Sequence, residues 1–207
     1  MKKQQVFFIH GGSAYSEYDN FLNGLRNKAL WSPTGEVSKK WSLTLREDLG
    51  GEYELFALQM PNKQNAKYEE WKIWFERHFV YMHDDVVLLG WSLGGMFLTK
   101  YLIENEVSNR VKKLLLIASV WGGGSLNIEG GEDCGDFEYD IEKVDGLAQK
   151  VETIVIMYSK DDFVVPYEHA LKYKEALPEA ELVTFEDKNH FLITEFPELI
   201  EMIKEVG

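Results

Sequence analysis

Six short runs of apolar and β-branched residues recur along the chain, and helical patterns separate them. The runs are continuous rather than alternating, which is typical of strands buried on both faces of a parallel sheet. Parallel strands need long crossover connections, and helices between the runs provide them. The pattern predicts an α/β fold, a three-layer α/β/α sandwich with about six mostly parallel strands. The predicted strands are Val6–Ile9, Tyr53–Met60, Val86–Gly90, Val111–Ser119, Ile154–Tyr158 and Glu181–Phe185.

Apolar residues at helical spacing predict the connecting helices. One helix is expected from Tyr18 to Leu30. A second is expected to open with Ser32 as N-cap and Pro33 as its first helical residue, and to bury Trp41, Leu45 and Leu49. Further helices are expected over Tyr68–Phe79, Gly94–Glu106 and Tyr139–Gln149, and in a C-terminal segment whose core face is Phe196, Leu199, Ile200 and Ile203.

Length and charge limit the class of protein. The 207 residues suit a single domain, and 35 acids against 22 bases give a net charge of −13. Without a basic cluster, nucleic acid and anionic membrane surfaces are poor candidate partners. Cys134 is the only cysteine, so neither an intrachain disulfide nor a typical structural zinc site is expected. The N-terminal apolar run is too short for a signal peptide or a membrane span, and we expect a cytoplasmic location.

The most informative motif is Gly90-Trp91-Ser92-Leu93-Gly94-Gly95, a Gly-x-Ser-x-Gly pattern between a predicted strand and a predicted helix. A sharp strand-to-helix turn exposes its central serine at the carboxyl edge of the sheet, and the glycines remove the Cβ atoms that would collide there. Ser92 is therefore a candidate nucleophile. The amide of Leu93, at the start of the helix, is a candidate donor to an oxyanion. The alternative is a tight turn in which the serine only caps the helix.

A serine nucleophile needs a base, and the base needs an acid to fix its tautomer. His190 follows the last predicted strand, and Asp162 follows the fifth. The order Ser92, Asp162, His190 fits a nucleophile-elbow architecture, because all three residues come after strands whose carboxyl ends share one sheet edge. These positions predict a catalytic triad. Asp161 is the less favoured candidate for the acid and is interpreted as a solvated neighbour, able to supply a local hydrogen bond.

With these motifs, the chain resembles the α/β-hydrolase superfamily, in the compact, capless form of the serine hydrolases of the retinoblastoma-binding-protein type. The resemblance implies that the acid is the aspartate four residues before Pro166, which is Asp162, and that Ser159 stands where the pattern has glycine. His10-Gly11-Gly12 resembles the oxyanion loop of this family. Gly12 is then the second oxyanion donor, with Ser13 as the alternative, and the expected task of His10 is to hold the loop.

Other residues are placed around the expected site. Trp91 and Trp121 follow or end strands and are candidates for walls of the substrate pocket, with Ser13 as a further substrate-binding candidate; ordinary core packing is the alternative for each tryptophan. The segment Glu129–Glu142 holds seven acids and no base. Because it follows the fourth strand, it is expected to flank the site, favouring cationic or neutral substrates, and to raise the pKa of Cys134.

The remaining histidines are not expected to act in chemistry. His78 and His83 beside Asp84 and Asp85 are interpreted as surface residues, because a five-residue spacing does not place two histidines on one helix face. His169 is expected to be exposed. The sequence thus predicts a serine hydrolase that cleaves small esters without a cofactor or a metal. Thioester, amide or peptide hydrolysis by the same triad, perhydrolysis, and a non-catalytic interaction protein remain alternatives.

Overall fold

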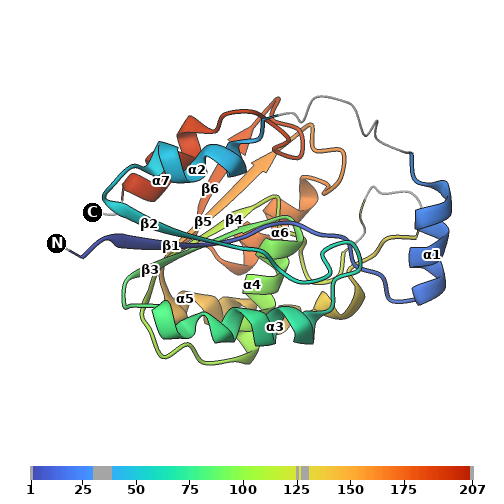
Figure 1. Cartoon of the computed structure of the whole chain (residues 1–207), viewed down its shortest axis with the longest axis horizontal. Helices are drawn as coiled ribbons and strands as arrows, with labels where there is room; N and C mark the ends of the chain where they lie inside the picture. The colour runs from blue at the N-terminus through green and yellow to red at the C-terminus, as the bar shows by residue number, and fades with distance from the viewer. Residues whose placement is uncertain (1, 30–38, 125, 127–130, 206–207) are drawn as a thin grey trace.

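A six-stranded sheet forms the centre of the protein in the computed structural model, which describes residues 2–29, 39–124, 126 and 131–205. The strand order is β2-β1-β3-β4-β5-β6, and all five neighbouring pairs are parallel. Helices cover both faces, which confirms the predicted three-layer α/β fold (Figure 1). The strands are β1 (Gln4–Ile9), β2 (Tyr53–Leu58), β3 (Val86–Trp91), β4 (Val111–Ile117), β5 (Val151–Ser159) and β6 (Glu181–Phe185).

Two apolar cores lie on the two faces of the sheet. In β1, Phe7 and Ile9 belong to one core, and Val6 and Phe8 belong to the other, as the twofold repeat of a strand requires. Every one of these four side chains is at least 96% buried, which explains why the strand reads as a continuous apolar run. The larger core is covered by α3 (Tyr68–Arg77), α4 (Leu93–Glu104), α5 (Leu147–Lys150) and α6 (Glu168–Ala176), and the smaller one by α2 (Trp41–Leu49) and α7 (Pro197–Lys204).

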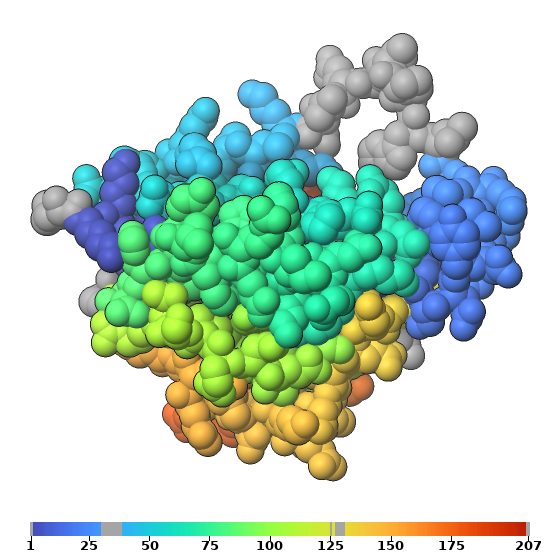
Figure 2. Space-filling view, turned by 60° about the horizontal axis from the view of Figure 1, so that its bottom comes forward, coloured from blue at the N-terminus to red at the C-terminus, as the bar shows by residue number. Residues whose placement is uncertain are grey.

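The first helix, α1 (Tyr18–Asn27), stands apart from both layers. It lies beyond the carboxyl ends of the strands, and in the space-filling view it forms a blue protrusion at one end of the molecule (Figures 1 and 2). The loops that follow β1, β3, β4, β5 and β6 emerge at this same end. Residues far apart in the sequence are thereby brought together there. Within the described residues, none of the helices combines the length and the apolar character needed to cross a lipid bilayer.

The structure corrects two predicted helices. The second begins at Trp41, with Lys40 as its extended N-cap residue, and the expected start at Ser32 and Pro33 lies outside the described residues. The predicted crossover helix over Tyr139–Gln149 is wrong in form. A 3-10 helix over Ile141–Gly146 leads directly into the four-residue α5, and β5 begins at Val151. This short connection still buries Val144 and Leu147, so tight 3-10 turns replace a regular amphipathic helix.

Candidate active site

Ser92 lies between β3 and α4 in a strained backbone conformation, with φ 55° and ψ −123°. Its N–H donates to the carbonyl of Ile117 in β4 at 2.8 Å, and its own carbonyl accepts from the amides of Gly95 and Met96 at 2.9 and 3.2 Å. A serine at positive φ is unfavourable by itself, so the surrounding structure has to impose it. The hydroxyl-bearing residue is therefore held rigidly at the carboxyl end of the central strand β3.

Two glycines of the motif allow this turn. A Cβ on Gly90 would lie 2.5 Å from the Cα of Gly95, and a Cβ on Gly94 would overlap the carbonyl oxygen of Ile9. Real Cβ atoms do not approach backbone this closely, so any side chain at either position would push α4 away from β3 or β1. The glycines therefore let the N-terminus of α4 pack directly against the end of β1, beside the loop that follows it.

His190 and Asp162 form a buried pair on the loops after β6 and β5. The Nδ1 of His190 lies 2.8 Å from Oδ2 of Asp162, and the two side chains are 8% and 0% exposed. The other oxygen of Asp162, Oδ1, accepts from the amides of Val164 and Val165 at 2.8 and 2.9 Å. The carboxylate therefore accepts the Nδ1 proton, which leaves Nε2 of the imidazole as a proton acceptor.

Leu93 and Gly12, the predicted oxyanion donors, lie close to each other. Leu93 is the first residue of α4, where backbone N–H groups have no acceptor within the helix. A Cβ built on Gly12 would lie 3.4 Å from the side chain of Leu93, so the two residues are neighbours. A Cβ built on Gly11 would lie 3.7 Å from Oγ of Ser92. The loop after β1 thus runs past Ser92 and the start of α4.

Ser13 is not available as the alternative oxyanion donor. Its amide donates to the carbonyl of Lys63 at 2.8 Å. Its side chain lines the same cavity as Ser92. Of the two candidates, Gly12 is therefore the residue whose amide is compatible with an oxyanion site.

His10 cross-links the loop after β1 to the end of β2. Its Nε2 accepts from the amide of Met60 at 3.0 Å, and its Nδ1 lies 2.6 Å from the carbonyl of Gly11. Burial lowers the pKa of His10, which favours the neutral ring with the proton on Nδ1. Both ring nitrogens are thus engaged with backbone, in agreement with the expected loop-holding role.

Ser92, Leu93, His190 and Gly12 line one cavity of about 630 Å³. Asp162 lies behind His190, completely buried on its side-chain surface. The cavity combines these polar groups with apolar walls, an arrangement common in sites that bind small molecules. The apolar lining comes from Trp91, Val120, Leu126, Phe163, Val165 and Leu192.

The acidic segment reaches the cavity with only part of its charge. A bridge between Ala14 and Asp133 ties it to the loop after β1, and Glu132 and Asp133 line the cavity. Burial raises the pKa of Glu132. Nζ of Lys28 lies 3.8 Å from Oε2 of Glu132.

Three lysines, Lys28, Lys40 and Lys63, line the same cavity and offset these two acids. The charge of the lining, counted over the described residues, therefore gives no basis for the expected preference for cationic substrates. Glu129, which the sequence analysis also assigned to the acidic segment, lies outside the described residues.

Cys134 also lines the cavity but is unsuited to act as a nucleophile. The residue is 3% exposed, and burial, followed by the charges of Glu138, Asp133 and Glu132, raises its pKa to about 12. The sequence predicted the direction from the carboxylates alone, whereas burial is the larger cause. Because the thiolate is the reactive form, we expect almost no reaction with a disulfide reagent such as DTNB in mildly alkaline buffer. One equivalent should react after unfolding in guanidinium, and rapid labelling of native protein would contradict the assignment.

The two candidate wall tryptophans have different positions. Trp91 lines the cavity, and its indole Nε1–H donates to the carbonyl of His190 at 3.2 Å. Trp121 is 9% exposed, packs edge-on against Tyr139 and Tyr173, and is not among the described residues that line the cavity. The expectation for Trp121 as a pocket wall is therefore wrong, and its alternative as a core aromatic residue holds.

The prediction that His169 is exposed is also wrong. His169 is 3% exposed, and its Nδ1 accepts the backbone N–H of Trp121 at 2.9 Å. Because the chain turns after β4, the buried amide of Trp121 has no hydrogen-bond acceptor on a neighbouring strand. The imidazole of His169, from α6, supplies the acceptor. Among the described residues, no group of three or more histidine, cysteine, aspartate or glutamate side chains has an arrangement that could hold a metal ion.

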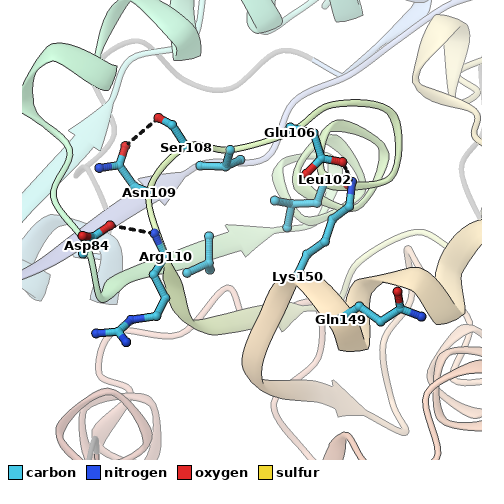
Figure 3. Close-up of a pocket in the computed structure, with 10 residues that line it drawn as sticks. Asp84, Leu102, Glu106, Ser108, Asn109, Arg110, Gln149 and Lys150 are labelled. Atoms are coloured by element: carbon cyan, nitrogen blue, oxygen red, sulfur yellow. Dashed lines mark hydrogen bonds and ion pairs between the residues drawn. The ribbon is translucent and has the colours of Figure 1, made fainter.

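A second cavity, of about 450 Å³, lies at the amino ends of β3 and β4, away from Ser92. Its charged groups are paired: Lys150 binds Glu106 at 2.9 Å, and Asp84 accepts the backbone amide of Arg110 at 2.9 Å (Figure 3). No histidine is among the described residues that line it. The cavity at the carboxyl edge, with its serine, its histidine and its helix N-terminus, is therefore the site with catalytic potential.

Comparison with known proteins gives structural matches only. No family model matches the sequence, and no curated protein matches it. The ydeN gene product of B. subtilis superimposes with a TM-score of 0.69 at 18% identity, covering 99% of this chain and 98% of that one. The meta-cleavage product hydrolase CumD from Pseudomonas fluorescens IP01 matches with a TM-score of 0.66 at 14% identity, covering 99% and 90% of the two chains.

The esterase RhEst1 from Rhodococcus sp. ECU1013 matches with a TM-score of 0.62 at 14% identity, over 99% of this chain and 92% of that one. These identities are low, and they establish the architecture only. The shared architecture extends along nearly the whole length of this chain. The chain has the α/β-hydrolase fold in a compact form, with no cap domain among the residues that the structure describes.

Proposed function

We propose that this protein is a serine hydrolase that transfers the acyl group of small esters to water. The observation that carries the proposal is the buried Asp162–His190 pair, 2.8 Å apart, in one cavity with a serine held at a strained strand-to-helix turn. That two structures of the same fold are described as a hydrolase and an esterase supports the class of reaction.

In the proposed reaction, Nε2 of His190 removes the hydroxyl proton of Ser92 as Oγ attacks the ester carbonyl carbon. Asp162 holds the Nδ1 proton and stabilises the imidazolium that forms. The carbonyl oxygen becomes an oxyanion, to which the amides of Leu93 and Gly12 donate. The imidazolium then gives its proton to the leaving alcohol, and the C–O bond breaks to leave an acyl-serine.

Deacylation repeats these steps with water. His190 takes a proton from a water molecule, the resulting nucleophile attacks the acyl carbon, and Oγ of Ser92 leaves with the proton returned by the imidazolium. The acid is released and the enzyme is restored. Every group in this cycle comes from the protein, the substrate or water, so the proposal includes no cofactor. A cavity of about 630 Å³, with no cap domain among the described residues, fits a short or surface-presented acyl chain.

A fluorophosphonate probe tests the chemistry directly, because it phosphonylates only activated serines. We expect stoichiometric labelling of native protein, with the label on the peptide that contains Ser92, and hydrolysis of p-nitrophenyl acetate and butyrate. Protein unfolded in urea serves as the control and should take no label. Folded protein that neither reacts with the probe nor hydrolyses esters, thioesters or aminoacyl amides would instead support a non-catalytic role.

A further inference from the structure

The loop that carries His190 has two residues with an unfavourable backbone conformation. The residues on both sides of the histidine, Asn189 and Phe191, have φ values of 44° and 55°. L-amino acids with side chains rarely adopt such values, least of all bulky ones. Contacts from elsewhere in the fold therefore help to hold the loop that carries His190 into the cavity lined by Ser92.

The side chains of Ser159 and Asp161 supply contacts on one side of this loop. Oγ of Ser159 accepts the amide of Lys188 at 2.9 Å, and Oδ1 of Asp161 accepts the amide of Asn189 at 2.8 Å. The Ser159 hydroxyl in turn donates to the same Oδ1 at 2.5 Å. The two side chains thus bind the two consecutive backbone amides that precede His190, at the point where β5 and β6 end side by side (Figure 1).

Two indoles hold the other side of the loop. Nε1 of Trp91 donates to the carbonyl of His190 at 3.2 Å, and Nε1 of Trp41 donates to the carbonyl of Phe191 at 3.0 Å. The backbone of the loop is therefore fixed by its amides on the β5 side and by its carbonyls on the tryptophan side. With the indoles in place, removal of the Ser159 and Asp161 contacts would free one side only.

We propose that Ser159 and Asp161 are positioning residues that hold the backbone of the His190 loop so that the imidazole keeps its geometry toward Ser92. This inference rests on the proposed serine hydrolase function. It also gives the two consecutive aspartates different tasks: Asp162 binds the imidazole itself, and Asp161 binds the backbone before it. Ser159 is completely buried at the position where the resembled sequence pattern has glycine, and this contact explains its hydroxyl.

The test compares Ser159→Ala, Asp161→Ala and their double variant with wild-type protein on p-nitrophenyl butyrate. Each single variant should lower kcat by about 10-fold to 100-fold with little change in KM, because misplacement of a catalytic group mainly affects the transition state. The double variant should lose less than the product of the two single losses, because both side chains hold one loop. In the NMR spectrum, the low-field Nδ1 proton of His190 should broaden in each variant.

Asp161→Asn provides the conservative comparison. Both hydrogen bonds to Asp161 end on Oδ1, so an asparagine keeps its acceptor oxygen there, and this variant should retain most of the wild-type kcat. Asp187→Ala is the matched control, because it removes an exposed carboxylate from the same loop. Wild-type kcat in folded Asp161→Ala, a loss confined to KM, or equal losses in Asp161→Ala and Asp161→Asn would overturn the proposal.

Folding of the variants does not obscure the result. If Ser159→Ala fails to fold, the comparison of Asp161→Ala with Asp161→Asn decides alone. The Asp161 side chain is at the surface, so its removal leaves no buried cavity. Failure of the underlying function is separately visible: wild-type protein would then neither react with the fluorophosphonate nor hydrolyse the ester.

Discussion

The Ser92→Ala variant is expected to lose ester hydrolysis by about 10⁶-fold in kcat while it remains folded, because removal of the nucleophile disables the proposed triad as a unit. The substitution deletes only Oγ. The backbone bonds that hold the elbow, from Ser92 to Ile117, Gly95 and Met96, involve no side-chain atom and stay in place. The loss should therefore be chemical rather than structural.

The measurement is kcat on p-nitrophenyl butyrate together with fluorophosphonate labelling and the melting temperature. Ser108→Ala is the matched control, because Ser108 lies in the cavity at the opposite edge of the sheet. This variant should hydrolyse the ester and react with the fluorophosphonate as wild-type protein does. Retention of more than a small fraction of the activity by Ser92→Ala, with contaminating esterases excluded, would assign the reaction to another residue.

The strands could be predicted because burial on both faces leaves a direct trace in the sequence. Leu88 and Leu89 are neighbours in β3, yet they face opposite cores and are both fully buried. Such a run is readable without any knowledge of its partners. The elbow at Ser92 was predictable for a similar reason. Glycine is required on both sides of the serine because a Cβ there would collide with the backbone of the flanking strands and helix.

Features that depend on a single distant partner were not predictable. His169 lies in the first turn of α6, and only the turn after β4 shows why an imidazole is needed against the amide of Trp121. The three lysines of the cavity are far apart in the sequence from Glu132, so the lining that they share left no local pattern. The contacts of Ser159 and Asp161 with the histidine loop join residues 28 or 29 positions apart. A local pattern predicts burial and backbone geometry, but not the partner of a polar group.

Replacement of Asp162 by asparagine is expected to lower kcat by about 10⁴-fold, because the amide enforces the wrong tautomer of His190. Oδ1 of Asp162 accepts two backbone amides, from Val164 and Val165, so the carbonyl oxygen of an asparagine would take that place. Its NH₂ group would then face Nδ1 of the imidazole. Nδ1 would have to accept, the proton would move to Nε2, and the base could no longer take a proton from Ser92.

The decisive measurements are kcat on p-nitrophenyl butyrate and the ¹⁵N shifts of the imidazole, which report the tautomer. Asp187→Asn, an exposed residue on the histidine loop, is the control for the loss of one negative charge. Wild-type activity in Asp162→Asn would show that this carboxylate does not fix the base. The adjacent aspartate provides a second comparison. Replacement by asparagine should be tolerated at Asp161, because its hydrogen bonds use only one carboxylate oxygen. The same replacement should not be tolerated at Asp162, because its hydrogen bonds use both oxygens.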